Sequence, residues 1–252
     1  MTAQARRRTT RRFPSLTTCI SALTVAALGL MPSGAGIALA QDVHLGVDFL
    51  TGLPHSEFSN NLGANGYGIA AYGLYQMPRV PIGIGFELGY MKYGSKQRRE
   101  PLSPTLPDTT VKVRTSNNIL TNHLFLRFQP RLGSVRPYAD GLIGFKYLYT
   151  RTSVQGEGSS EPIAVSTNLG DCALSYGAGG GVQILLYQEQ AKRSKGRLAH
   201  ILLDAKLRYI RGSRADYLTP GSIHQENGQV IYDIRRSRTD MLVTQLGIAL
   251  RF

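Results

Sequence analysis

Three adjacent residues carry the side chains from which a hydrolase builds its catalytic site: His55, Ser56 and Glu57. A serine nucleophile needs a histidine within hydrogen-bond reach and an acid that orients this histidine. Adjacent side chains of an extended chain point in opposite directions, and Pro54 indicates a loop, so these three groups are not expected to converge. The other candidate bases have no serine two positions along the same face: His44, His123 and His200. We therefore expect no catalytic residues, with lipid modification as an alternative function.

A glycine-rich stretch, SYGAGGGV at Ser175–Val182, invites comparison with loops that bind nucleotide phosphates. Such loops need a third glycine where Val182 stands, and a helix pattern after the loop, which is missing here. Small residues that make room for side chains from an opposite wall explain this stretch better. The scattered histidines lack metal-site spacing, and no nucleic-acid-binding module is recognisable. We expect no cofactor, no metal site and no nucleic-acid partner.

Isolated charges interrupt apolar alternations in several segments. Within residues 200–209, one face is apolar or aromatic, whereas the other carries Asp204, Lys206 and Arg208. Across the chain, such sparse charged faces hold four acids, Asp48, Glu87, Asp140 and Asp204, and four bases, Arg127, Lys146, Lys206 and Arg208. Charges removed from water must pair. The matched numbers predict an interior charge network.

These residues must be positioned by strands, because eight segments alternate with a period of two: 43–50, 67–75, 82–93, 115–128, 138–151, 174–187, 200–211 and 239–252. The connections 51–66, 94–114, 152–173 and 212–238 are long, whereas 76–81 and 129–137 are short. Short turns at one end and long loops at the other are typical of an up-and-down membrane barrel. We predict an all-β chain that forms an eight-stranded antiparallel up-and-down transmembrane β-barrel.

A soluble β-sandwich is the competing fold, and it would bury the apolar faces and expose the charged ones. The charged faces are rich in glycine, as a crowded interior requires, so we predict that the apolar faces meet lipid. Tyrosines near the strand ends suit an aromatic girdle at the membrane interface: Tyr67, Tyr75, Tyr90, Tyr149, Tyr187 and Tyr209. The orientation of the segment 67–75 stays open, and Asn122 falls on the predicted lipid side.

Residues 1–40 differ in composition from the rest of the chain. Five arginines precede an apolar run from Ile20 to Leu30, and Ala38-Leu39-Ala40 stands before Gln41. This arrangement predicts a secretory signal peptide that is cleaved after residue 40. Residues 41–252 then form the barrel domain in the outer membrane of a Gram-negative-type envelope.

The segments RPYADGLIGFKYLY, LLDAKLRYI and LGIALRF, together with the signal, resemble the small outer-membrane β-barrel family, the eight-stranded relatives of outer-membrane protein A. The resemblance covers residues 41–252 and rests on pattern. In that family, a C-terminal strand that ends on phenylalanine is recognised by the machinery that inserts barrels. The resemblance therefore implies that Phe252 is an assembly signal and that the barrel assembly machinery is a partner.

The long loops are expected to carry the interactions of this protein, because an eight-stranded barrel is too narrow for a wide pore. Clustered arginines suit the phosphates of outer-leaflet glycolipid: Arg98 and Arg99 in the second long loop, with Arg235 and Arg236 in the fourth. We expect a membrane-structural or surface-interaction role, with lipid, glycolipid and an extracellular partner bound. A narrow channel or carrier for small apolar compounds is a further alternative.

Overall fold

The computed structural model describes residues 43–103, 106–156, 161–188, 200–226 and 229–252, and the expected signal peptide at 1–40 lies outside them. Its elements are β1 (Val43–Pro54), α2 (Glu57–Leu62), β2 (Gly66–Gln76), β3 (Ile82–Ser103), β4 (Leu106–Phe128), β5 (Val135–Gly156), β6 (Pro162–Gln188), β7 (His200–Gly212), β8 (Arg214–Glu226), β9 (Gln229–Arg238) and β10 (Met241–Arg251). No helix within these ranges is long and apolar enough to cross a membrane.

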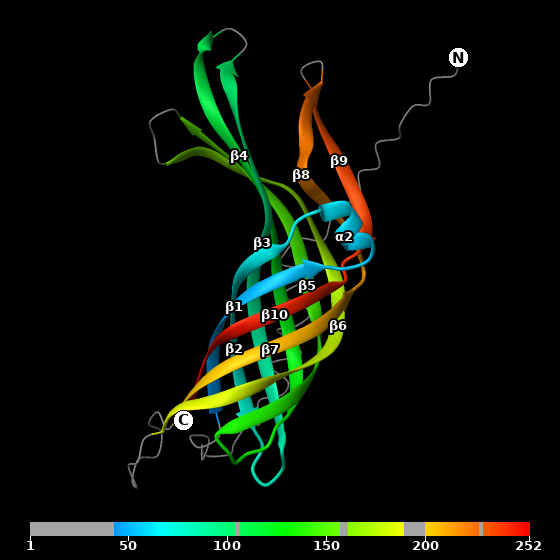
Figure 1. Ribbon diagram of the computed structural model, residues 1–252. Coiled ribbons are helices and arrows are strands. Elements are labelled where there is room, and N and C mark those ends of the chain that lie inside the picture. Colours follow the sequence, from blue (N-terminus) through cyan, green and yellow to red (C-terminus); the bar gives the residue numbers. More distant parts are fainter. Residues whose placement is uncertain (1–42, 104–105, 157–160, 189–199, 227–228) are drawn as a thin grey trace, which may run out of the picture.

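Eight of the strands close into a barrel in the order β1–β10–β7–β6–β5–β4–β3–β2 (Figure 1). Every neighbouring pair is antiparallel, and β10 closes the ring against β1, where Leu45 lies opposite Leu250. At the same seam, the amide of Phe252 donates a hydrogen bond of 3.0 Å to the carbonyl of Val43. Closure removes the unpaired edges that a flat sheet would expose. The predicted eight-stranded up-and-down barrel is confirmed.

The two faces of the barrel wall differ in chemistry. In the lower barrel wall most side chains that point outward are apolar, and the strongly exposed ones include Val47, Phe49, Ile69, Leu126, Ile143 and Leu246. Side chains that point inward include the charged residues and are buried. In β2, Tyr72 is buried and Ile69 is exposed, which settles the orientation that the sequence leaves open. Asn122 lies on the outward side, as expected from the alternation.

The strands extend beyond the apolar alternation from which they are predicted. β3, β4, β5 and β6 rise above the rest of the barrel as a four-stranded sheet and take up most of the expected loops 94–114 and 152–173 (Figure 1). The long connection 212–238 joins two barrel strands as expected, but most of it forms the β8–β9 hairpin and not an irregular loop. In these regions the hydrogen-bonded pairing of the strands continues, but the outward side chains are polar. Hydrophobic periodicity alone therefore does not reveal these parts of the strands.

The raised end of the barrel is covered by α2 and β8. Phe58 of α2 is fully buried, and its ring lies 5.2 Å from that of Tyr217 and 6.4 Å from that of Tyr93. The hydroxyl of Tyr93 donates to the carbonyl of Leu218 over 3.3 Å. These contacts join α2, β3 and β8 in one apolar cluster over the lumen.

Candidate functional site

Arg208 lies at the centre of a charge network in the barrel interior. Its guanidinium contacts the carboxylate of Glu87 at 2.7 Å and that of Asp140 at 2.5 Å. Asp140 also accepts two hydrogen bonds from Arg127, at 2.8 and 3.0 Å. All four side chains are buried. The network therefore connects β3, β4, β5 and β7 across the lumen.

A second part of the network surrounds Lys206. Its ammonium lies 2.8 Å from Asp48, 3.5 Å from Asp204 and 3.6 Å from Glu87. Asp204 also accepts hydrogen bonds of 2.6 Å from the hydroxyls of Tyr72 and Tyr138. Aromatic rings complete the enclosure of the cations: Lys206 lies 3.9 Å from the centre of the Tyr72 ring, and Arg127 lies 3.6 Å from that of Tyr138.

Glycine makes room for these large side chains. A Cβ atom on Gly46 would lie 2.2 Å from the ring of Tyr72, and one on Gly85 would lie 2.2 Å from that of Phe125. Each glycine sits on the inward side of its strand, next to a ring from a neighbouring strand. The small residues are thus needed where bulky groups cross the lumen, as close packing requires.

Lys146 lies apart from the other interior charges. It is fully buried, and its Nζ donates a hydrogen bond of 2.7 Å to the backbone carbonyl of Thr239. No salt bridge joins it to an acid among the described residues. The structure therefore brings seven of the eight sequence-selected charges together, and Lys146 instead fastens β5 to the segment that precedes β10.

The triplet His55-Ser56-Glu57 does not form a hydrolase arrangement. The ring of His55 packs edge-on against Tyr209, with centroids 5.8 Å apart. The carboxylate of Glu57 accepts a hydrogen bond of 3.3 Å from the amide of Arg238. Ser56 has a positive φ of 53° immediately before α2. His55 and Glu57 thus contact different strands, and the Ser56 side chain makes no hydrogen bond that caps α2.

A serine–histidine pair that sequence reasoning missed lies inside the barrel. His123 Nε2 and Ser175 Oγ are 2.7 Å apart, although they are 52 positions apart in sequence. Glu87 lies directly opposite His123 in the β3–β4 ladder. Both members of the pair are buried, so a substrate cannot reach the serine oxygen in this structure. Only the register of two distant strands could have revealed this pair. Among the described residues, no group of three or more His, Cys, Asp or Glu side chains could hold a metal ion.

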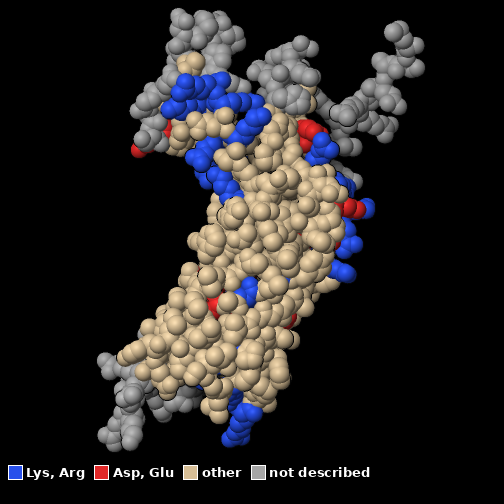
Figure 2. All heavy atoms as spheres, viewed as in Figure 1, with Lys and Arg blue, Asp and Glu red and all other residues tan. Residues whose placement is uncertain are grey.

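A basic surface lies on the outward side of the raised strands β3, β4 and β5. Arg99 lies opposite Lys112, and Arg114 Nε donates to Ser95 Oγ over 3.4 Å on the same side. Lys and Arg side chains gather over these raised strands in Figure 2, above a wall that is largely free of charge. We call this surface the outer basic face; it consists of Lys92, Arg99, Lys112, Arg114 and Arg151.

The outer basic face lies next to Tyr67 and Tyr149, two of the tyrosines near the strand ends. Lys92 is opposite Tyr67 on one side and Asn118 on the other, and Asn118 is in turn opposite Tyr149. Within the described part of the chain, four of its members make no salt bridge with an acid: Lys92, Lys112, Arg114 and Arg151. Like charges opposite each other on neighbouring strands repel. An external anion would relieve this repulsion.

The arginines selected from the sequence do not form one cluster. Arg99 belongs to the outer basic face, whereas Arg98 points to the other side of β3 and donates to the carbonyl of Ile223 in β8 over 2.9 Å. Arg235 and Arg236 lie on β9 and face the acids Asp233 and Asp216, at 3.2 and 3.6 Å. The remaining residues of the outer basic face were not selected from the sequence. Lys112 and Arg114 lie in a segment predicted to be a loop, and Lys92 and Arg151 lie in predicted strands.

No protein-family model and no curated protein sequence matches the chain. Similar solved structures include Neisserial surface protein A, with a TM-score of 0.43 and 14% identity over 83% of this chain and 97% of that chain. The outer membrane protein Ail of Yersinia pestis gives 0.36 and 15%, over 84% and 99%. A major outer membrane protein from Thermus thermophilus gives 0.40 and 13%, over 83% and 99%. Because each TM-score is below 0.5, these likenesses carry no conclusion about the function of this chain.

Proposed function

We propose that this protein is an outer-membrane β-barrel with a filled interior, which binds phosphorylated glycolipid on its outer wall and presents its raised strands to an extracellular partner. The apolar outward face carries the membrane assignment. Side chains such as Phe49 and Ile143 are more than half exposed on a closed barrel, and a soluble monomer rarely shows contiguous apolar surface of this kind. A closed barrel also satisfies its backbone groups internally, as hydrocarbon requires.

The orientation follows from the topology. An even number of strands places both ends of the barrel chain on the periplasmic side, together with the short turns. The raised sheet and the β8–β9 hairpin then lie outside the cell. Residues 1–40 direct export in this proposal, and Phe252 at the β1–β10 seam serves as the assembly signal.

Heat-modifiable migration on gels tests the membrane barrel. The protein from an outer-membrane fraction is expected to migrate differently before and after boiling, because a closed barrel resists detergent until heated. A Phe252→Ala variant is expected to reduce the folded band when the protein is produced in cells. A single mobility that does not depend on boiling, or recovery in the soluble fraction, would count against the proposal.

The filled interior supports a role without transport. The Arg208 and Lys206 networks cross the lumen, and the cluster of Phe58, Tyr93 and Tyr217 covers its raised end. In planar bilayers, the protein is expected to give no stepwise conductance. Regular unitary steps that vanish in unfolded preparations would favour the narrow channel instead.

Glycolipid binding is supported by the outer basic face. Its cations lie immediately beyond the exposed rings of Tyr67 and Tyr90, which mark the interface of the membrane. Phosphate groups of an outer-leaflet glycolipid occupy this level, and arginine pairs well with phosphate.

Native mass spectrometry with a purified bisphosphorylated glycolipid tests this assignment. The triple variant Lys112→Gln, Arg114→Gln and Arg151→Gln is expected to bind the glycolipid about a hundredfold more weakly, since each of the three charge-assisted contacts contributes about 1 kcal/mol. The matched control is Arg235→Gln with Arg236→Gln, whose arginines face acids on β9. Equal retention by the triple variant and the wild-type protein would contradict the assignment.

We propose no catalytic role for the serine–histidine pair or for the His55 triplet. The burial of Ser175 and the separate contacts of His55 and Glu57 support this view. Cells that carry Ser56→Ala or Ser175→Ala are expected to have lipid profiles identical to those of the wild type. Loss of a modified lipid species in either variant would contradict this view and would favour a lipid-modifying enzyme.

A further inference from the structure

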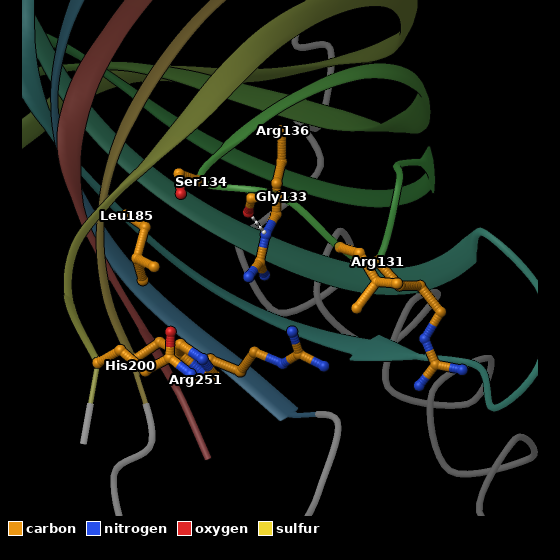
Figure 3. A pocket seen from close by; sticks show the side chains of 9 residues that line it. Arg131, Gly133, Ser134, Arg136, Leu185, His200 and Arg251 are labelled. Atoms are coloured by element: carbon orange, nitrogen blue, oxygen red, sulfur yellow. Dashed lines mark hydrogen bonds between the residues drawn. The ribbon is translucent and has the colours of Figure 1, made fainter. Parts of the chain in front are cut away.

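A basic hollow lies at the end of the barrel where the chain terminates. It has a volume of about 680 Å³ and is lined by residues of the β4–β5 turn and by the ends of β6, β7 and β10. Figure 3 shows the guanidinium of Arg136 directed towards the side chains of His200 and Arg251. A hydrogen bond of 2.9 Å from Arg136 Nε to the carbonyl of Gly133 holds this guanidinium in place.

The lining of the hollow is basic. Among the residues that the structure describes, it contains the side chains of Arg131, Arg136, Arg251 and His200 and no acidic residue. Arg251 lies opposite His200 on one side and His44 on the other, so three basic side chains form a row across three neighbouring strands. Arg136 itself is buried. A buried cation without an acid in the same lining differs from Arg127 and Arg208, which each bind carboxylates.

Several polar atoms around the hollow lack partners. His200 Nδ1 and both ring nitrogens of His44 are buried without a hydrogen-bond partner. Tyr187 is exposed and lies opposite Ile201, so His200, one residue further, lies beyond the aromatic girdle. Burial lowers the pKa of His200, and the positive charges of Arg251 and Arg136 lower it further. The same positive field attracts an anion.

We propose that this hollow binds a phosphate group. Two or three arginines around one space match the several oxygens of a phosphate, and their planar guanidinium groups can donate paired hydrogen bonds. A volume of about 680 Å³ accommodates a small phosphorylated molecule or the headgroup of a phospholipid. A neutral imidazole at His200 can donate one further hydrogen bond. The site does not depend on the glycolipid surface at the opposite end.

Two titrations of the folded full chain in neutral detergent micelles test the site and distinguish the sources of phosphate. In the first, inorganic phosphate is added at low ionic strength and followed by ³¹P NMR. In the second, phosphatidylglycerol is added and its retention is measured by native mass spectrometry. Saturable binding of inorganic phosphate indicates a soluble ligand, whereas retention of the lipid alone indicates a headgroup.

The variants Arg136→Gln and Arg251→Gln are expected to weaken binding about tenfold each, the effect of one lost charge-assisted contact. Arg131→Gln lies in an exposed turn and tests the site if either of the others fails to fold, as judged by heat-modifiable migration. The matched control, Arg235→Gln, removes an arginine at the opposite end and is expected to bind as the wild type does. Absence of binding in both titrations, or equal affinity of wild type and folded variants, would overturn the proposal.

Discussion

Arginine occurs in two contrasting settings in this barrel. In the middle of the lumen, Arg127 and Arg208 are enclosed by carboxylates and aromatic rings. At the two ends, the structure describes no acid in the lining of the basic hollow around Arg136 and no salt bridge from Arg114 on the outer basic face. In the buried interior of the barrel a charge must be compensated by the chain itself, because burial removes it from water. Near water, the compensation can be left to a ligand.

The largest effect on the free energy of unfolding is expected from Arg208→Ala, which removes a buried cation that pairs with two carboxylates. The change leaves Glu87 without its shortest ion pair and Asp140 with one arginine fewer. Removal of one member of a buried pair destabilises by about 3–5 kcal/mol. Urea unfolding in lipid vesicles, followed by gel migration, measures the loss. The control Arg235→Ala is expected to change the stability little, and similar midpoints for the two variants would show that the interior network is not needed for stability.

A double-mutant cycle on Asp48 and Lys206 sharpens the comparison. Lys206 lies 2.8 Å from Asp48, and no other salt bridge joins Asp48 to a described base. We expect a coupling free energy of about 1–3 kcal/mol between Asp48→Asn and Lys206→Met, because each single change leaves a buried group without its partner. Unfolding free energies of the four proteins give this coupling. Strictly additive effects would mean that the two charges do not compensate each other.

Gly46→Ala tests whether the interior is closely packed around its charges. The added methyl group would meet the ring of Tyr72, whose hydroxyl binds Asp204. Overpacking of this kind destabilises by about 1–3 kcal/mol. Gly73→Ala is the matched control, because its Cβ would lie 3.6 Å from the closest atom, at ordinary contact distance. Equal unfolding free energies for the two variants would contradict a filled lumen beside Gly46.

The smallest effect on stability is expected from Arg114→Gln with Arg151→Gln on the outer basic face. Surface substitutions of this kind change the free energy of unfolding by about 0.5 kcal/mol or less. The same double variant is expected to lower glycolipid retention. At this surface, a change can therefore weaken binding without a comparable loss of stability. If unfolding in lipid-free micelles showed a large loss of stability, these arginines would have a structural role instead.

The alternation of apolar and polar residues predicted the fold and the side of each strand on which the charges lie. It could not predict the raised part of β3 and β4, since side chains such as Gln97 and Arg114 have no apolar periodicity, nor the β8–β9 hairpin. Sequence reasoning placed all eight charges on inward faces but could not tell that Lys146 donates to a backbone carbonyl, because alternation fixes a face and not a partner. Sequence reasoning also did not predict the contact between His123 and Ser175, because only the closed barrel brings these two residues together.

By itself, the sequence determined which residues of each strand share an apolar face and which share a sparsely charged one, because local alternation sets the direction of each side chain. The tertiary structure decided which charges meet, since pairing across a lumen depends on the register and stagger of all eight strands. It also decided where basic residues gather, at the outer basic face and in the hollow around Arg136. Those two surfaces come from residues distant in the chain, and no local pattern links them.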